Sequence, residues 1–317
     1  MRLKRNPRSA AGAACWIVCA IGAFTATASV GSSLSFCQSP TESNAAVQDR
    51  MMQVAAIVKG ELERSGRTLA LVSRSGLALQ RLGQRYSHTG VSLKASANAA
   101  WSVRQLYYAC DEQRPRIFDQ GMTGFVLGSY DPAQGFLSIV FLPDTAALML
   151  ERTALDDQQA LQLLGGSYSA NAYAFGLRYQ NCNQWLAELL ARSWTNRSTD
   201  GNVRAQAQQW LQAQGYEPSL VQVHWQPLVW LAANLPWLHT DDHPSEDLAK
   251  AQFRVSLPES IESFVHSLHP DAQRIELCYN EFHVVIRRSW LRIEADCHPG
   301  EGDEVTALST SDFPTLR

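Results

Sequence analysis

Apolar positions recur at two different periods along this chain, and the two periods predict a mixture of helices and strands. An apolar residue at every third or fourth position indicates one buried face of a helix; such stretches lie at 51–65, 145–164, 181–193, 202–214 and 260–268. Alternating or continuous short apolar runs indicate strands; these lie at 68–72, 85–93, 101–108, 135–142, 221–225, 274–279 and 281–294. The strands follow one another closely while the helices come in separate groups, so the pattern predicts an α+β fold.

Composition narrows the class of protein. The 317 residues include 27 Lys and Arg against 30 Asp and Glu, a formal net charge of −3, and 45% of them are hydrophobic. This apolar content excludes a mainly disordered chain. The near-neutral balance provides no domain-scale basic surface to collect phosphates, so we expect no nucleic-acid partner. Nothing in the pattern indicates an oligomeric state.

The N-terminal residues have the pattern of an export signal. Four basic residues and no acidic residue occupy positions 1–8, and positions 9–28 are small, apolar and uncharged. The sequence Ala26-Thr27-Ala28 fits a small-residue cleavage site. We therefore predict a cleaved signal at 1–28 and a periplasmic or secreted protein, with a retained membrane anchor as the alternative. After signal removal we expect no contact with a membrane.

Cysteine parity adds to the picture of an exported protein. Two of the seven cysteines lie within the signal, which leaves an odd number in the mature chain. In an oxidising compartment an odd number predicts disulfides and one free thiol. The alternative is that the number has no meaning and that several cysteines are reduced, buried apolar residues. We expect one pairing of the three that four cysteines permit: Cys37 with Cys110 and Cys278 with Cys297, leaving Cys182 free.

Cys182 and His88 are the candidate reactive residues. Cys182 begins the strongest amphipathic helix, after Asn181 as a favoured N-cap, and the N-terminal end of a helix stabilises a thiolate. Alternation in strand 85–93 places His88 on the same face as Gly90. Gln105 on the next strand could then reach the second ring nitrogen of His88 and fix its tautomer. Spacing alone also fits a core histidine beside a glycine. A reactive Cys182–His88 pair is therefore a hypothesis, and it predicts that Cys182 is a thiolate at neutral pH.

Longer motifs carry a resemblance to known proteins. The motifs are RYSHTGVSL (85–93), FDQG (118–121), RYQNCNQW (178–185), GYEP (215–218) and DDHP (241–244). Together they resemble the bacterial family called domain of unknown function 2145. The order of a His strand, a second strand and a Cys helix also looks like the circularly permuted branch of the papain-like, NlpC-type cysteine hydrolases.

That resemblance implies a fold and a set of roles. It implies a permuted papain-like domain at 29–195, with a mostly antiparallel sheet and a packed nucleophile helix, and a C-terminal α+β extension at 196–317 packed on it. Cys182 would be the nucleophile and His88 the base, with Gln105 in the third position, where His or Asn is more usual. An oxyanion hole or cleft would use the Cys182 backbone N–H; further candidates for it are Tyr179, Gln184 and Asn181.

The function that follows is an exported thiol hydrolase or acyltransferase acting on amide or ester bonds, with cell-wall peptides as the expected substrates. The alternative is a noncatalytic envelope module that keeps the fold and only binds a ligand. No cofactor and no metal are expected. The HTDDH segment at 239–243 has metal-binding side chains, but a structural turn with Asp242 or Ser245 capping the next helix is the simpler interpretation. Trp225, Trp230 and Trp237 fit a core or partner surface better than a carbohydrate platform.

Overall fold

The computed structural model describes residue 37 and residues 44–77, 79–129, 131–195, 201–223 and 235–309. The described helices and strands all belong to one compact unit, Ser39–Arg317. The unit has the predicted α+β composition. The export signal predicted at 1–28 lies outside the described residues.

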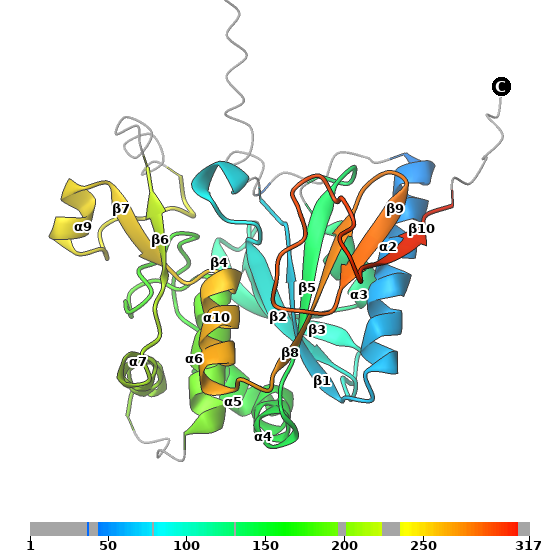
Figure 1. The fold of residues 1–317 in the computed structure, drawn as a ribbon. Coiled ribbons are helices and arrows are strands. Elements are labelled where there is room, and N and C mark those ends of the chain that lie inside the picture. Colours follow the sequence, from blue (N-terminus) through cyan, green and yellow to red (C-terminus); the bar gives the residue numbers. More distant parts are fainter. Residues whose placement is uncertain are drawn as a thin grey trace, which may run out of the picture. The chain divides into compact units, whose positions relative to one another are not determined.

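A large antiparallel sheet forms the centre of the unit (Figure 1). Within the described residues it has eight strands in the order β10-β9-β8-β5-β1-β2-β3-β4, and every pairing is antiparallel. The strands are β1 (Leu69–Arg74), β2 (His88–Leu93), β3 (Ser102–Ala109), β4 (Arg114–Gln120), β5 (Gly135–Phe141), β8 (Gln273–Tyr279), β9 (His283–Arg287) and β10 (Glu304–Ala307). A separate two-stranded sheet contains β6 (Ser219–Gln222) and β7 (Gln252–Val255).

Helices cover both faces of the large sheet. They are α2 (Ala45–Arg64), α3 (Met122–Leu127), α4 (Asp144–Leu155), α5 (Asp157–Gln162), α6 (Cys182–Trp194), α7 (Val203–Ala213), α9 (Ser245–Ala249) and α10 (Pro258–Leu268), with a short 3₁₀ turn at Gln80–Leu82. One face packs on α2 and α3, whose residues Val54, Leu62 and Phe125 share a core cluster with Val72 of β1. Figure 1 shows α6, α10 and α4 on the other side of the sheet from α2. The buried Ser73, which points away from the Val72 face, donates to Glu262 of α10.

The predicted elements are confirmed where their apolar pattern was strong, and they differ elsewhere. Strands β7 and β10 were not predicted, and the strand predicted at 281–294 is only β9, His283–Arg287. The helix predicted at 145–164 is two helices, because Asp156 leaves the helical conformation and its carboxylate caps α5, accepting from the backbone of Gln158 and Gln159. Strand β4 and helix α3 were not predicted. Four of the seven β4 residues are charged or proline, which hides an edge strand from an apolar pattern.

The C-terminal residues complete the large sheet. We predicted residues 196–317 as an extension packed on the domain at 29–195. In the structure β8 pairs with β5 along its whole length, from Gly135–Tyr279 to Phe141–Gln273. The last strands are therefore part of the central sheet, and the division at residue 195 stays a prediction.

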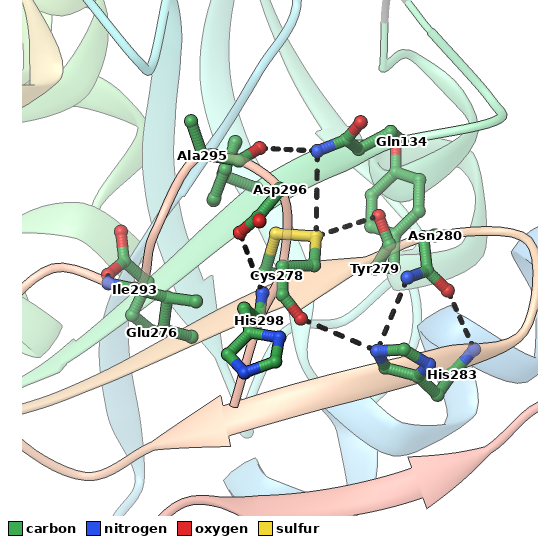
Figure 2. Close-up of a disulfide and its surroundings, with 12 residues drawn as sticks. Gln134, Glu276, Cys278, Tyr279, Asn280, His283, Ile293, Ala295, Asp296 and His298 are labelled. Carbon is green, nitrogen blue, oxygen red and sulfur yellow. Dashed lines mark hydrogen bonds between the residues drawn. A yellow bond between two sulfur atoms is a disulfide. The ribbon is translucent and has the colours of Figure 1, made fainter. Parts of the chain in front are cut away.

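Disulfides secure the unit. Cys278 and Cys297 form the predicted disulfide, with a Cα–Cα distance of 5.4 Å, and Figure 2 shows Gln134 and Tyr279 beside this bond. Cys37 and Cys110 are each disulfide-bonded as well, while their predicted pairing with each other stays a prediction. Disulfides fit a protein outside the cytoplasm. Within the described residues no helix is long and apolar enough to span a membrane.

Candidate functional site

Helix α6 begins at Cys182, as predicted. The side chain of Asn181 caps the helix and accepts a hydrogen bond from the backbone N–H of Gln184 at 2.7 Å. Cys182 is the free thiol among the cysteines that the structure describes. The backbone N–H groups of Cys182 and Asn183 both interact with its sulfur, as expected at a helix N-terminus.

His88 and Gln105 are brought together as the strand alternation predicts. Nε2 of His88 lies 2.5 Å from Oε1 of Gln105, and Nε2 of Gln105 donates to Oε1 of Gln120 at 2.7 Å. Because the second bond assigns the amide oxygen of Gln105 toward the ring, the neutral imidazole carries its proton on Nε2. Nδ1 is then the basic nitrogen. The sequence reading missed Gln120, although it lies in the quoted FDQG motif.

Asn183 fastens the start of α6 to the strand that carries His88. The last residue pair between β2 and β3 is Val91–Arg104. Past this pair, the side chain of Asn183 takes the place of β3 beside the backbone of β2. Its Oδ1 accepts from the backbone N–H of Thr89, and its Nδ2 donates to the carbonyl of Ser87, each at 3.1 Å. These two bonds bracket His88, so they hold Cys182 next to the His88 segment. Sequence analysis missed this role, since no local pattern marks it.

The Cys182 thiol and the His88 imidazole do not form a hydrogen bond with each other in the part of the chain that the structure describes. The thiol instead interacts with the hydroxyl of Tyr168. The imidazole meets the edge of Tyr107, with 5.6 Å between ring centroids. Both residues are buried, with 8% of Cys182 and 7% of His88 exposed.

Burial reverses the predicted charge state of the pair. Desolvation raises the pKa of Cys182 to about 12, although the nearby backbone N–H groups and the charge of Arg74 act to lower it. Desolvation and the charge of Arg74 lower the pKa of His88 to about 3. The predicted thiolate at neutral pH is therefore wrong for this conformation: the resting pair is a neutral thiol and a neutral imidazole. The sequence could not reveal how completely both groups leave water.

Arg74 lies close to Cys182 and His88, which the sequence did not predict. It ends β1 directly opposite His88 in the ladder, and its charge acts on both Cys182 and His88. Only 4% of its surface is exposed. The sequence analysis assigned Arg74 no role, because it follows the predicted strand without any motif.

The side chains of three predicted oxyanion or cleft residues have structural contacts. The amide Nε2 of Gln184 donates to the carbonyls of Tyr173, Ala174 and Gly176, and thus holds the loop before α6. The hydroxyl of Tyr179 is bonded to Asp241, and its ring stacks on His239 with 4.4 Å between centroids. The side chain of Asn181 is engaged as the N-cap. These side chains are committed to structure, which leaves the N–H groups of Cys182 and Asn183 as candidate oxyanion donors.

The HTDDH segment (239–243) forms hydrogen bonds with the loop that precedes α6. Asp242 accepts from the backbone N–H of Tyr173 at 2.9 Å, and Nε2 of His243 lies 2.7 Å from the carbonyl of Asn171. The predicted structural turn is thus present. The predicted capping of the next helix is wrong, because α9 begins after Pro244 without a side-chain cap. No cluster of three or more metal-binding side chains occurs among the described residues, and Trp225 and Trp230 lie outside them.

A buried ion pair anchors α6 from its far side. Glu188 is fully buried, and both of its oxygens accept from the guanidinium of Arg204 on α7, at 2.8 and 3.0 Å. Arg204 also donates to the carbonyls of Leu177 and Tyr179. A glutamate within the apolar LAELLA run is the sequence signal that could have identified this pair.

Comparison with known proteins supports the family resemblance. No curated protein and no solved structure matches this chain. A family described as "Uncharacterized protein conserved in bacteria (DUF2145)" matches residues 61–265, which include His88, Gln105 and Cys182. Because the match covers more than half of the chain, the protein belongs to this bacterial family.

Proposed function

We propose that this protein is an exported thiol hydrolase or acyltransferase that acts on amide or ester bonds, with Cys182 as nucleophile and His88 as base. One observation carries the proposal: Gln105 and Gln120 hold the His88 ring with its proton on Nε2 and its basic Nδ1 available. A free thiol at the start of the adjacent helix, fastened there by Asn183, supports it. We propose further that this arrangement is a circularly permuted papain-like core.

The neutral resting pair suits a general-base mechanism. Sγ of Cys182 attacks the carbonyl carbon of the substrate while the thiol proton passes to Nδ1 of His88. The carbonyl oxygen becomes an oxyanion facing the N–H groups of Cys182 and Asn183. The imidazolium then protonates the leaving amine or alcohol, and a thioester remains on Cys182. Water or another acceptor attacks this thioester with His88 again taking the proton, and the thiol is restored.

The compartment supplies the proposed substrate. Disulfides fit a location outside the cytoplasm, and we propose a periplasmic or secreted protein that acts on peptides of the cell wall. An acyl group on Cys182 can pass to water or to an amine, so hydrolysis and transfer share the same first step.

The test is direct detection of the thioester. The purified chain is incubated with p-nitrophenyl acetate or with cell-wall peptides and quenched in acid, and mass spectrometry measures acylation of Cys182. We expect acylation of the wild type, none at this position in Cys182→Ser, and a rate lower by about 100-fold or more in His88→Ala. His283→Ala is the matched control, because His283 lies on β9 outside the cluster and its loss should leave the rate unchanged. Equal rates in His88→Ala and the wild type would overturn the proposal.

Burial of both reactive residues favours a second candidate, a noncatalytic envelope module that binds a ligand at this site. Cys182 and His88 are each more than nine-tenths buried, and both are neutral at pH 7. Under this candidate Cys182 is never acylated, and Cys182→Ser binds cell-wall fragments as tightly as the wild type. Mass spectrometry of Cys182 after incubation with the same fragments separates the two functions, because only the hydrolase becomes acylated.

A further inference from the structure

Arg74 is a buried cation for which the described part of the chain supplies no counter-anion. The structure describes two other buried arginines, and each of them is neutralised: Arg204 by Glu188, and Arg274 by Glu262 and Glu276. No carboxylate of the described residues pairs with Arg74. An unpaired buried charge costs several kcal/mol, so proteins normally supply a partner. Among the described residues, Arg74 therefore lacks the carboxylate that the other two buried arginines have.

The guanidinium is nevertheless held firmly in place. One terminal nitrogen donates to the carbonyl of Gly128, and the group lies over the ring of Phe125 at 5.4 Å from its centroid. A Cβ at Gly128 would be only 2.7 Å from the other terminal nitrogen, so the backbone approaches closely because that residue is glycine. The buried Nε has no hydrogen-bond partner among the residues that the structure describes. Arg74 is thus oriented by the fold and keeps unused capacity to donate.

Two exposed aromatic side chains, Tyr107 and Phe118, lie near Arg74. Tyr107, which is 39% exposed, interacts with Arg74 and meets the edge of His88. Phe118 on β4, 48% exposed, packs edge-on against Tyr107. These two exposed rings therefore lie at the surface beside His88 and Arg74.

We propose that Arg74 binds a carboxylate of the substrate, so that the protein acts on amides or esters that carry a carboxylate close to the reacting carbonyl. This inference rests on the proposed function and names its substrate class. A guanidinium matches a carboxylate with two parallel N–H donors. An incoming carboxylate also neutralises the buried charge, so binding removes an electrostatic cost that the free protein carries.

Two alkylating reagents that differ in charge test this recognition. Iodoacetate carries a carboxylate and iodoacetamide a neutral amide, and both replace iodide with the Cys182 sulfur. The ratio of their rates cancels any effect of Arg74 on the thiol itself, because that effect is common to both reagents. We expect the iodoacetate-to-iodoacetamide ratio to fall about tenfold or more in Arg74→Met, the effect of one charge-assisted hydrogen bond. Arg178→Met is the matched control, since Arg178 is exposed and already paired with Asp241, and its ratio should stay near that of the wild type.

A binding measurement on the unaltered chain keeps the inference testable if Arg74→Met does not fold or Cys182 reacts with neither reagent. Thermal unfolding of the wild type is followed with rising acetate and, at matched ionic strength, with chloride and acetamide. Acetate should raise the melting temperature, while acetamide and chloride should not. An unchanged reagent ratio in Arg74→Met, or equal effects of acetate and chloride, would overturn the carboxylate site. Acetate binding without acylation of Cys182 would retain the site and refute only the hydrolase.

Discussion

The bridge that Asn183 makes between α6 and β2 predicts a large loss of stability in Asn183→Ala. The side chain is 1% exposed, and alanine would leave two buried backbone groups, the N–H of Thr89 and the carbonyl of Ser87, without the partner that they now have. Each unsatisfied buried group costs about 1–3 kcal/mol. We therefore expect the free energy of unfolding to fall by about 2–6 kcal/mol in this variant.

Urea unfolding followed by tryptophan fluorescence measures this change. Asn98→Ala is the matched control, because Asn98 also donates to a backbone carbonyl, that of Asp119 at 2.9 Å, but is exposed. Water replaces that bond, so the control should change the free energy of unfolding by no more than about 0.5 kcal/mol. If Asn183→Ala is no less stable than Asn98→Ala, then Asn183 does not fasten α6 to the His88 strand and the geometry of the site is wrong.

Three further predictions concern stability. Burial lowers the pKa of His88 from its usual 6.5 to about 3, so between these pH values the unfolded chain binds a proton that the folded protein does not. The free energy of unfolding therefore falls with decreasing pH by about 1.4 kcal/mol per pH unit. Urea titrations from pH 7 to pH 4 should show a shallower fall in His88→Gln. Glu188→Ala leaves the Arg204 cation buried and unpaired and should lower the free energy of unfolding by about 3–5 kcal/mol. The double variant Glu188→Ala with Arg204→Met should lose less stability. A double-mutant cycle that shows no coupling energy between the two residues would contradict this ion pair. Replacing both Cys278 and Cys297 with serine opens a loop with a sequence separation of 19 residues and should lower the unfolding free energy by about 3 kcal/mol, which calorimetry under oxidising conditions checks.

The helix and strand pattern determined most of the fold. The apolar runs that became β1, β2, β3 and β5 depend on side chains one or two positions apart, and such local order is readable without a structure. The cap at Asn181 and the alternation that places Gln105 beside His88 follow from the same short-range rules.

Long-range pairing was beyond that pattern. Strand β8 joins the sheet beside β5 although more than a hundred residues separate them in the chain, and nothing in either run of residues names the other as its partner. The edge strand β4 lacks a continuous apolar pattern, since only part of its surface is covered.

The chemistry of the site depended on tertiary structure for the same reason. The sequence by itself determined which residues are present: a cysteine at the start of a helix, a histidine on a strand and a glutamine on the next. Only the packing of α6, β2 and β1 decided that Asn183 holds the helix to the His88 strand and that Arg74 is buried without a carboxylate. Desolvation depends on every atom that replaces water around a group. It therefore reversed the charge expected for Cys182 from its place at a helix end.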